Sequence, residues 1–296
     1  MRIVVTGRQG QVVRSLLERA QGSDFYIETL GRPELDLGGP PDAVIEAVKA
    51  ANPDIIVSAA AYTQVDKAEG ERTVAFAVNE QAPRAIARAA RALDVPLIHL
   101  STDYVFEGSK TSPYLEDDVT QPTGVYGQSK LAGERAVLEE HSNSTVLRTA
   151  WVYSPFGANF VKTMLRLAGE REKIAVVADQ RGNPTSALDI ADGILRVAAN
   201  LIASQESSQR GIFHMTAAGE ASWAEFAEAI FSASARSGGP TATVRPIRTK
   251  DYPTPAKRPA NSRLNSDKLA RTHGVRLPDW RSSLKQIVER LVPQEL

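Results

Sequence analysis

The stretch Arg2-Ile3-Val4-Val5-Thr6-Gly7-Arg8-Gln9-Gly10-Gln11-Val12 decides the fold of this chain. Its apolar first part, Arg2–Thr6, predicts a buried strand, and Gln11–Ala20 predicts an amphipathic helix. A glycine-rich turn joins the two. A strand, a short turn and a helix in this order form a βα unit, the building block of a parallel sheet covered by helices.

The turn itself predicts a phosphate-binding site. Gly7 permits a tight change of direction, and Gly10 lets the backbone approach a pyrophosphate at the N-terminus of the helix. We therefore expect Gly7, Gly10, Gln11 and Val12 to contact a dinucleotide, with a turn that binds no ligand as the alternative. The third glycine of this motif is replaced by Val13, which affects the packing of the helix more than phosphate contact.

Short apolar runs and helix-like stretches alternate through the first half of the chain. Expected strands are Phe25–Leu30, Asp54–Ser58, Pro96–Ser101 and Ser144–Thr149, and expected helices are Pro41–Ala51, Arg72–Leu93 and one that carries Tyr126. This alternation predicts right-handed βαβ units and an α/β fold with a Rossmann-like, doubly wound parallel sheet. Because ligands bind beyond the carboxyl ends of such strands, the candidate motifs should converge on one rim.

The pattern is less regular after about Trp151. Expected helices are Ala158–Glu170, Ser186–Leu201, Ser222–Ala235 and Leu284–Leu291, expected strands are Lys173–Ala178 and Gly211–Met215, and Pro246–Pro259 is expected to be irregular. We expect residues 1–150 to form a dinucleotide-binding Rossmann domain. Residues 151–296 should form mainly a smaller substrate-binding lobe, with some segments returning to the Rossmann domain.

Tyr126 and Lys130 stand four residues apart, which places them one turn apart on one face of the expected helix. An ammonium group beside a phenol favours the phenolate, so we expect Lys130 to lower the pKa of Tyr126 from its free value of about 10. Such a tyrosine can exchange a proton with a carbonyl oxygen near neutral pH. The alternative is a solvated helix face, but the glycine turn and Ser101-Thr102 favour catalysis.

The composition excludes several kinds of site. Among 296 residues, 35 Lys and Arg balance 35 Asp and Glu, and this zero net charge gives no indication of binding to nucleic acid or acidic membranes. The chain has no Cys, which excludes disulfides and Cys-ligated metals, and its four His show no ligand spacing, so no metal site is predicted. No signal or membrane-spanning segment is recognised, and we expect a soluble cytoplasmic protein.

The end of the second strand indicates which dinucleotide is used. An acidic residue there would bind the adenosine ribose of NAD, but the sequence has Gly31-Arg32 instead. Arg32 is placed to meet a 2′-phosphate, which favours NADP with NAD tolerated, and a merely solvated Arg32 is the alternative. Asp36 and Leu37 are expected to flank the adenine.

Ala59, Ala60 and Ala61 close the third strand, and their small side chains allow a dinucleotide to lie across the backbone, although helix packing would favour the same residues. Asp66 and Glu69 follow. We expect these two carboxylates to cap a helix or orient a lobe rather than to form a catalytic pair.

These features together resemble the extended short-chain dehydrogenase/reductase family and, within it, the dTDP-4-dehydrorhamnose reductases. The most specific motifs are Ser101-Thr102-Asp103-Tyr104-Val105-Phe106 and Arg258-Pro259-Ala260-Asn261-Ser262-Arg263-Leu264. The resemblance runs nearly end to end, and its other segments are Gly7–Val12, Asn52–Asp54, Ala59–Thr63, Val65–Glu69, Val125–Glu134, Leu147–Tyr153, Asn159–Phe160 and Asp179–Thr185.

The resemblance implies a reaction in which NADPH delivers a hydride to C4 of dTDP-4-dehydro-L-rhamnose. It assigns proton donation to Tyr126, and to Lys130 the tuning of Tyr126 and contact with the nicotinamide ribose. It assigns to Thr102 a hydrogen bond to the reacting oxygen. Tyr104 and Trp151 match family positions that contact the deoxysugar, and Asp103 and Asn159 are also expected to bind the substrate.

Arg258 and Asn261 are expected to help hold the diphosphate of the substrate, because the segment around them is basic and an arginine fork matches phosphate oxygens. The alternative is that Arg258 pairs with a carboxylate and pins an irregular loop. Some family members dimerise through magnesium held by glutamates. The corresponding positions here are Ser15 and Leu188, so we expect a monomer or a homodimer without a metal bridge.

Two other functions remain open at this point. One is a different nucleotide-sugar ketoreductase or epimerase on the same scaffold. The other is a non-catalytic NADP-binding subunit, resembling a regulatory subunit of methionine adenosyltransferase. The complete set of Thr102, Tyr126 and Lys130 favours catalysis.

Overall fold

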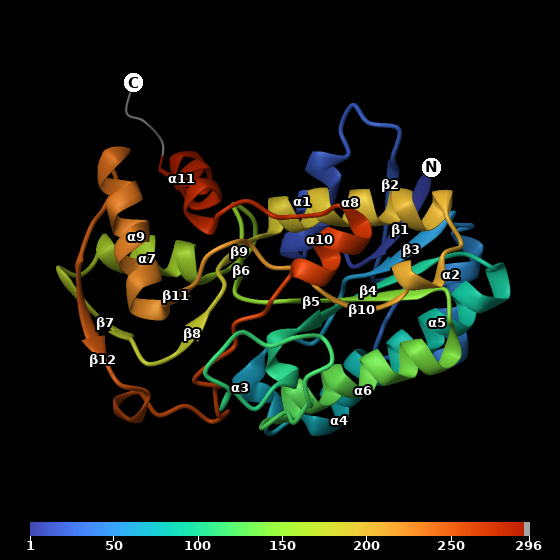
Figure 1. The fold of residues 1–296 in the computed structure, drawn as a ribbon, viewed down its shortest axis with the longest axis horizontal. Coiled ribbons are helices and arrows are strands. Elements are labelled where there is room, and N and C mark those ends of the chain that lie inside the picture. The colour runs from blue at the N-terminus through green and yellow to red at the C-terminus, as the bar shows by residue number, and fades with distance from the viewer. Residues whose placement is uncertain (293–296) are drawn as a thin grey trace.

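The computed structural model describes residues 1–292 and confirms the α/β fold. Six parallel strands form the central sheet in the order β10-β5-β4-β3-β1-β2 (Figure 1). Their bounds are β1 Arg2–Thr6, β2 Tyr26–Leu30, β3 Ile55–Ser58, β4 Leu97–Thr102, β5 Ser144–Thr149 and β10 Gly211–His214. The strand order changes direction between β1 and β3, and a crevice that binds ligands forms at such a point.

Helices cover both faces of the sheet (Figure 1). One face carries α1 Gln11–Arg19, α8 Ala187–Ala203 and α10 Asp267–His273, and the other carries α2 Pro41–Ala50, α5 Ala82–Leu93 and α6 Val125–Glu140. Within β1, Ile3 and Val5 pack with Ile190 of α8. Between them, Val4 points the other way and packs with Ile86 of α5. Burial on both faces explains why the strands of this sheet are continuously apolar.

A smaller lobe lies beside the sheet, at the left of Figure 1. It contains the parallel pair β7 Lys173–Val177 and β12 Thr243–Ile247, the helices α7 Phe160–Ala168, α9 Trp223–Arg236 and α11 Trp280–Leu291, and the short strands β6 Val152–Tyr153, β8 Arg181–Gly182, β9 Thr185–Ser186 and β11 Ala221–Ser222. Its core includes Ile174, Phe226 and Trp280. The expectation that Pro246–Pro259 is irregular is wrong at its start, because Pro246 lies within β12, which pairs only with β7.

The second half of the chain returns to the central sheet. β10 pairs with β5 as an additional parallel strand, and α8 packs along α1. α10 packs against both β10 and α8, and the sequence analysis did not predict this helix.

The long helix expected over Arg72–Leu93 contains a π-helical turn. It consists of α4 Arg72–Phe76, the π turn Ala77–Gln81 and α5, and the short helix α3 Val65–Ala68 precedes it. The π turn directs the buried Asn79 side chain away from the helix. Its Oδ1 accepts from the Tyr62 N–H at 2.8 Å, and its Nδ2 donates to Ser129 Oγ at 3.0 Å. Since Ser129 belongs to α6, this turn fixes α6 against its neighbour.

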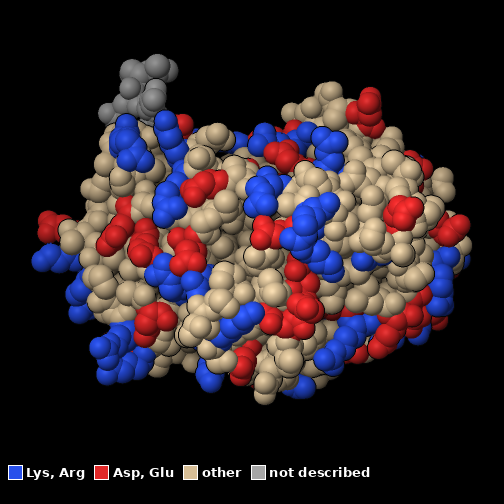
Figure 2. Space-filling model, viewed as in Figure 1, with Lys and Arg blue, Asp and Glu red and all other residues tan. Residues whose placement is uncertain are grey.

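The charged side chains of both signs are interspersed over the face shown in Figure 2. Many form ion pairs, such as Arg290 with Glu18 at 2.8 Å. Within residues 1–292, the structure contains no helix with the length and apolar character needed to span a membrane.

Gly133→Ala is expected to lower the free energy of unfolding by about 2 kcal/mol or more, because a Cβ at this position would lie 2.0 Å from the backbone oxygen of Asn79. Neither of the two backbones can move without breaking helical hydrogen bonds. The control is Gly70→Ala, whose Cβ would meet nothing closer than 3.8 Å. Urea unfolding of both variants measures the effect, and equal stabilities would contradict this close packing.

Candidate active site

Tyr126 and Lys130 lie one turn apart near the start of α6, as the spacing predicts. The helix starts where it does because the Val125 N–H donates to Glu69 Oε1 at 2.9 Å, which confirms the capping role expected for Glu69. The Tyr104 ring packs edge-on against the Tyr126 ring, with centroids 5.5 Å apart. The phenol of Tyr126 is therefore held beside the end of β4.

The expectation that Lys130 lowers the pKa of Tyr126 is wrong for this structure. Burial raises the pKa of Tyr126 to about 12, and the influence that opposes it comes from the nearby Thr102 side chain. Lys130 does not offset the burial because its ammonium points elsewhere. It donates to the Leu100 carbonyl at 2.7 Å and lies 3.4 Å from His99 Nε2. Tyr126 is therefore a neutral phenol at neutral pH.

Burial also acts on Lys130 and lowers its pKa to about 8, while the charge of Glu134 opposes this effect. The side chain is almost fully buried, so it is a cation held in a poorly solvated place. His99, its neighbour, is a core histidine whose Nδ1 lies 3.1 Å from Ser58 Oγ. Burial holds the pKa of His99 well below its usual value, so it stays neutral beside Lys130.

Thr102 and Asp103 end β4 next to these two residues. The Thr102 hydroxyl donates to Asp103 Oδ1 at 2.9 Å and accepts from the Tyr104 N–H at 3.2 Å. Asp103 Oδ2 has no hydrogen-bond partner among residues 1–292. Burial raises the pKa of Asp103 to about 6 against the influence of the Ser262 and Thr102 hydroxyls. A buried carboxylate oxygen that lacks a donor suits a ligand hydroxyl.

A cavity of about 460 Å³ joins the glycine turn to the two residues on α6. It is lined by Gly7, Gln9, Gly10, Gln11, Val12, Val13, Ala59, Ala60, Ala61, Thr63, Leu100, Ser101, Tyr126, Lys130, Thr149, Val152, Gly157 and Ala158. Seven of the predicted cofactor contacts, from the turn and the third strand, lie together here. The hydroxyl of Thr6 accepts from the N–H groups of Ala59 and Ala60, which holds the two strand ends together.

The glycine turn fits a dinucleotide. Gly7 has a φ of +97°, and a Cβ on it would come within 3.2 Å of the Ala60 Cβ. Gly10 precedes α1 and has no side chain to cap the helix, so the first N–H groups of α1 stay available to a ligand in the cavity. Val13 is buried, and its Cγ2 takes the space beside both glycines.

The residues predicted for the adenosine end lie outside the lining of this cavity. Arg32 is 76% exposed and forms an ion pair with Asp36 at 2.9 Å, and Leu37 packs against the core below α2. Arg8 lies beside Gly31 and pairs with Glu34. The sequence analysis did not single out Arg8, although its place within the glycine turn is a usable signal.

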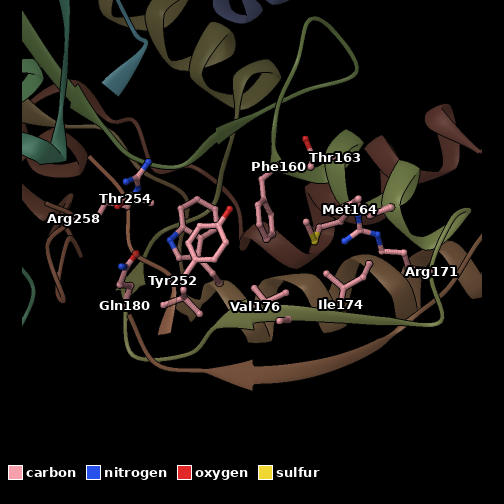
Figure 3. A pocket seen from close by; sticks show the side chains of 14 residues that line it. Phe160, Thr163, Met164, Arg171, Ile174, Val176, Gln180, Tyr252, Thr254 and Arg258 are labelled. Atoms are coloured by element: carbon pink, nitrogen blue, oxygen red, sulfur yellow. The ribbon is translucent and has the colours of Figure 1, made fainter. Parts of the chain in front are cut away.

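A second cavity of about 470 Å³ opens in the smaller lobe (Figure 3). Phe160 and Tyr252 lie in its middle, with Gln180 and Arg258 toward one end and Arg171 at the other. It is also lined by Thr163, Met164, Leu167, Ile174, Ala175, Val176, Val177, Trp223 and Thr254. Of its lining, the sequence analysis had named only Arg258 as a site residue. The others come from separate elements that only the fold brings together.

Arg258 has a carboxylate partner, as the alternative reading of this residue required. Its two terminal nitrogens bind Asp66 at 2.7 and 3.0 Å, and Asp66 also accepts from the Ala256 N–H. The lobe-orienting role expected for Asp66 is thus present. Arg258 also lines the second cavity, so the same side chain contacts both Asp66 and the cavity.

Two residues predicted to contact the substrate already have hydrogen-bond partners within the protein. Asn261 donates its amide protons to the carbonyls of Lys110 and Ser112, at 2.6 and 2.9 Å. Asn159 Nδ2 donates to Gln11 Oε1 and to the Ser154 carbonyl, and Asn159 Oδ1 caps α7. Neither amide has a free donor for a substrate, because each one ties segments of the protein together.

Trp151 stacks on Trp223, with ring centroids 3.5 Å apart and planes within 4°. Its Nε1 donates to Ser262 Oγ at 3.2 Å, and its φ is +47°. Since Trp223 lines the second cavity, this stack links the wall of that cavity to the chain that follows β5.

The model of the family described as the RmlD substrate binding domain matches residues 1–292. The dTDP-4-dehydrorhamnose reductase of Sinorhizobium fredii is 52% identical, over 99% of this chain and 98% of that protein. The chain belongs to the dTDP-4-dehydrorhamnose reductase family. This finding confirms the resemblance read from the sequence motifs.

Solved structures of this family agree with the fold. A dTDP-4-dehydrorhamnose reductase from Clostridium acetobutylicum has a TM-score of 0.91 and 35% identity, with 98% of this chain and 99% of that chain covered. One from Bacillus anthracis, in complex with NADP, has a TM-score of 0.87 and 35% identity, with 97% and 98% covered.

Asp103→Asn is expected to raise the free energy of unfolding by about 2 kcal/mol at pH 8. The pKa of Asp103 in the folded protein, about 6, lies above its ordinary value of 3.8, so folding favours the protonated form. Stability of the unmodified protein should fall as pH rises from about 4 to about 6, and the variant should lack this loss. Urea unfolding at pH 4 and pH 8 measures the difference, with the exposed Asp117→Asn as control. A gain that is the same at both pH values would contradict the raised pKa.

Proposed function

We infer that the chain is an oxidoreductase that uses NADPH to reduce the C4 keto group of dTDP-4-dehydro-L-rhamnose, which yields dTDP-L-rhamnose. The observation that carries this function is the match to the reductase family along the whole chain. The cavity that joins the glycine turn to Tyr126 and Lys130 agrees with it. The same match favours this reaction over a non-catalytic subunit.

The cofactor supplies the hydride when it is bound, and the residues of the chain manage the proton and the charge. Tyr126 is the proton donor to the C4 oxygen, and its raised pKa keeps it protonated until the oxygen gains negative charge. Lys130 places a positive charge one turn away, which stabilises the negative charge that develops on the C4 oxygen. The Thr102 hydroxyl, which donates to Asp103 in this structure, is proposed to turn its proton to the same oxygen when the substrate binds.

The pyrophosphate of the cofactor would lie at Gly7, Gly10, Gln11 and Val12, where N–H groups of α1 face the cavity. Ala59, Ala60 and Ala61 would lie beneath the dinucleotide. For the adenosine 2′-phosphate we propose Arg32, with Asp36 and Leu37 beside the adenine. Arg32 now pairs with Asp36, and an exposed pair of this kind is weak enough to exchange for a phosphate.

The second cavity is proposed to hold the nucleotide part of the substrate. Tyr252 and Trp223 offer aromatic surface for a base or sugar, and Arg258 offers a cation for the diphosphate. Tyr104 and Trp151 are proposed to form the wall beside the deoxysugar, and Asp103 Oδ2 to accept a hydrogen bond from one of its hydroxyls.

We propose a monomer or a homodimer that needs no bridging metal. Ser15, at one of the two positions that correspond to metal-binding glutamates, is buried, and its hydroxyl donates to the Gln11 carbonyl. Leu188 is buried in the core of the smaller lobe. Neither offers a carboxylate to a metal shared between copies. A cytoplasmic location is part of the same proposal, since the reaction uses NADPH and a nucleotide sugar.

Tyr126→Phe tests the reaction directly. It should lower kcat by about two orders of magnitude or more, because it removes a positioned proton donor. The affinities for both ligands should change little, since only a hydroxyl is lost. The assay follows NADPH oxidation with dTDP-4-dehydro-L-rhamnose made in situ, and Tyr26→Phe, at an exposed tyrosine of β2, is the control. Near-normal turnover of Tyr126→Phe would refute this role.

Arg258→Ala tests the nucleotide site. Loss of a phosphate contact should raise KM for the dTDP-sugar by about tenfold or more, while NADPH affinity and Tm stay nearly unchanged. Loss of the pair with Asp66 alone should lower Tm and leave that KM unchanged. Steady-state kinetics and a thermal melt distinguish the two, and the control Arg290→Ala removes a pair with Glu18, neither residue of which lines a cavity.

A further inference from the structure

Three successive turns of α6 contact the end of β4. Tyr126 lies near the Thr102 hydroxyl, and Lys130 donates to the Leu100 carbonyl. One turn further, Glu134 accepts from Ser101 Oγ at 2.5 Å. The mechanism uses the first two turns and leaves the third unexplained, although Glu134 is only 1% exposed.

Glu134 is half of a buried ion pair. Arg148 of β5 donates from Nε to Oε1 at 2.9 Å and from Nη2 to Oε2 at 2.7 Å. The remaining side of the guanidinium lies 5.1 Å over the Phe106 ring. Arg148 pairs across the sheet with Ser101, so one carboxylate binds two adjacent strands to the helix. All its partners are protein groups, and both charges are shielded from water.

Stability alone does not account for such a pair. Removing two charges from water is so unfavourable that apolar residues of similar volume often serve a protein equally well or better. The placement of this pair is specific, however. Glu134 follows Lys130 by four residues, which brings the two side chains onto adjacent turns with about 5 to 6 Å between their Cβ atoms.

We propose that Glu134 and Arg148 are positioning residues that fix the register of α6 on β4 and keep Lys130 in its charged form for the reaction. This proposal rests on the proposed function, because it concerns the same lysine. Glu134 supplies the negative charge. Arg148 holds the carboxylate of Glu134 in place and partly offsets the effect of that charge on Lys130.

None of the other groups named around Lys130 supplies the negative charge that would keep it protonated as directly as Glu134 does. On β4, His99 is neutral and 3.4 Å away, and on α6 the phenol of Tyr126 is neutral. Asp103, at the end of β4, bonds to Thr102. Burial lowers the pKa of Lys130 to about 8, and Glu134 is the neighbouring charge that raises it. Without Glu134, the ammonium would lose its proton at a lower pH.

The two partners should have opposite effects when removed. Glu134→Gln takes away the negative charge and leaves Arg148, so the alkaline limb of the kcat/KM profile should move to lower pH, by on the order of one pH unit. Arg148→Gln leaves the carboxylate unopposed, so the limb should move to higher pH. A merely structural pair would lower Tm in both variants and would leave the limb in place or shift it the same way in both.

Three further variants complete the test. Glu134→Gln/Arg148→Gln removes both charges and should still move the limb to lower pH, by less than Glu134→Gln alone, because Glu134 is the charge that raises the pKa of Lys130. Arg148→Lys keeps the charge but loses the fork, so it should lower Tm and leave the limb in place. Glu140→Gln removes a carboxylate from the far end of α6, where it pairs with Arg84 and Arg88, and should lower stability without moving the limb.

The protonation of Lys130 can also be followed without turnover, by NMR of 13C-labelled lysine side chains with Lys130→Arg to assign the signal. An inactive protein whose Lys130 titrates as described would refute the proposed reaction but support the role of this pair. If the single variants do not fold, the double variant still decides, because the proposal requires its Lys130 to titrate at a lower pH than in the unmodified protein. A Lys130 titration that is unchanged in the double variant and in every single variant that folds supports only a structural pair. Shifts of equal sign in Glu134→Gln and Arg148→Gln overturn the proposal.

Discussion

The docking of α6 against the end of β4 is the constraint on which the active site depends. One glycine makes this docking close, and a second holds α6 against the π turn at Asn79. A Cβ at position 127 would lie 2.2 Å from the Tyr104 carbonyl oxygen, and one at position 133 would lie 2.0 Å from that of Asn79. Backbone thus meets backbone on two sides of the helix. Because Tyr126 adjoins the first contact and Lys130 lies between the two, their positions are set by main chain rather than by flexible side chains.

The electrostatics of the site follow from that same burial. A phenol and an ammonium that are both removed from water are pushed toward their neutral forms, so the site tends to keep its proton on Tyr126 and to lose one from Lys130. A proton donor suits the first tendency, whereas a lysine that must stay charged needs a compensating carboxylate. The site therefore combines a dry environment, which strengthens interactions with developing charge, with a protein-internal source of negative charge.

Much of the fold and part of the site could be predicted from the sequence, because both depend on local periodicity. Apolar runs mark the strands, and the four-residue spacing of Tyr126 and Lys130 marks a helix face. The pKa of Tyr126 could not be predicted, since it depends on where the Lys130 ammonium points. The partner of Arg258 lies 192 residues away in the sequence, at Asp66. No residue pattern signals the π turn at Asn79, and Trp223 joins Trp151 only through the fold.

The return of the chain to the central sheet has a consequence for how the protein is made. β10 is the last strand of the central sheet to be synthesised, and until it pairs, β5 is an open edge with unsatisfied N–H and C=O groups. A nascent chain that has emerged only as far as α8 therefore carries an unpaired strand edge, and that strand bears Arg148. Chaperone binding during synthesis, or aggregation of truncated chains, would concentrate at this edge.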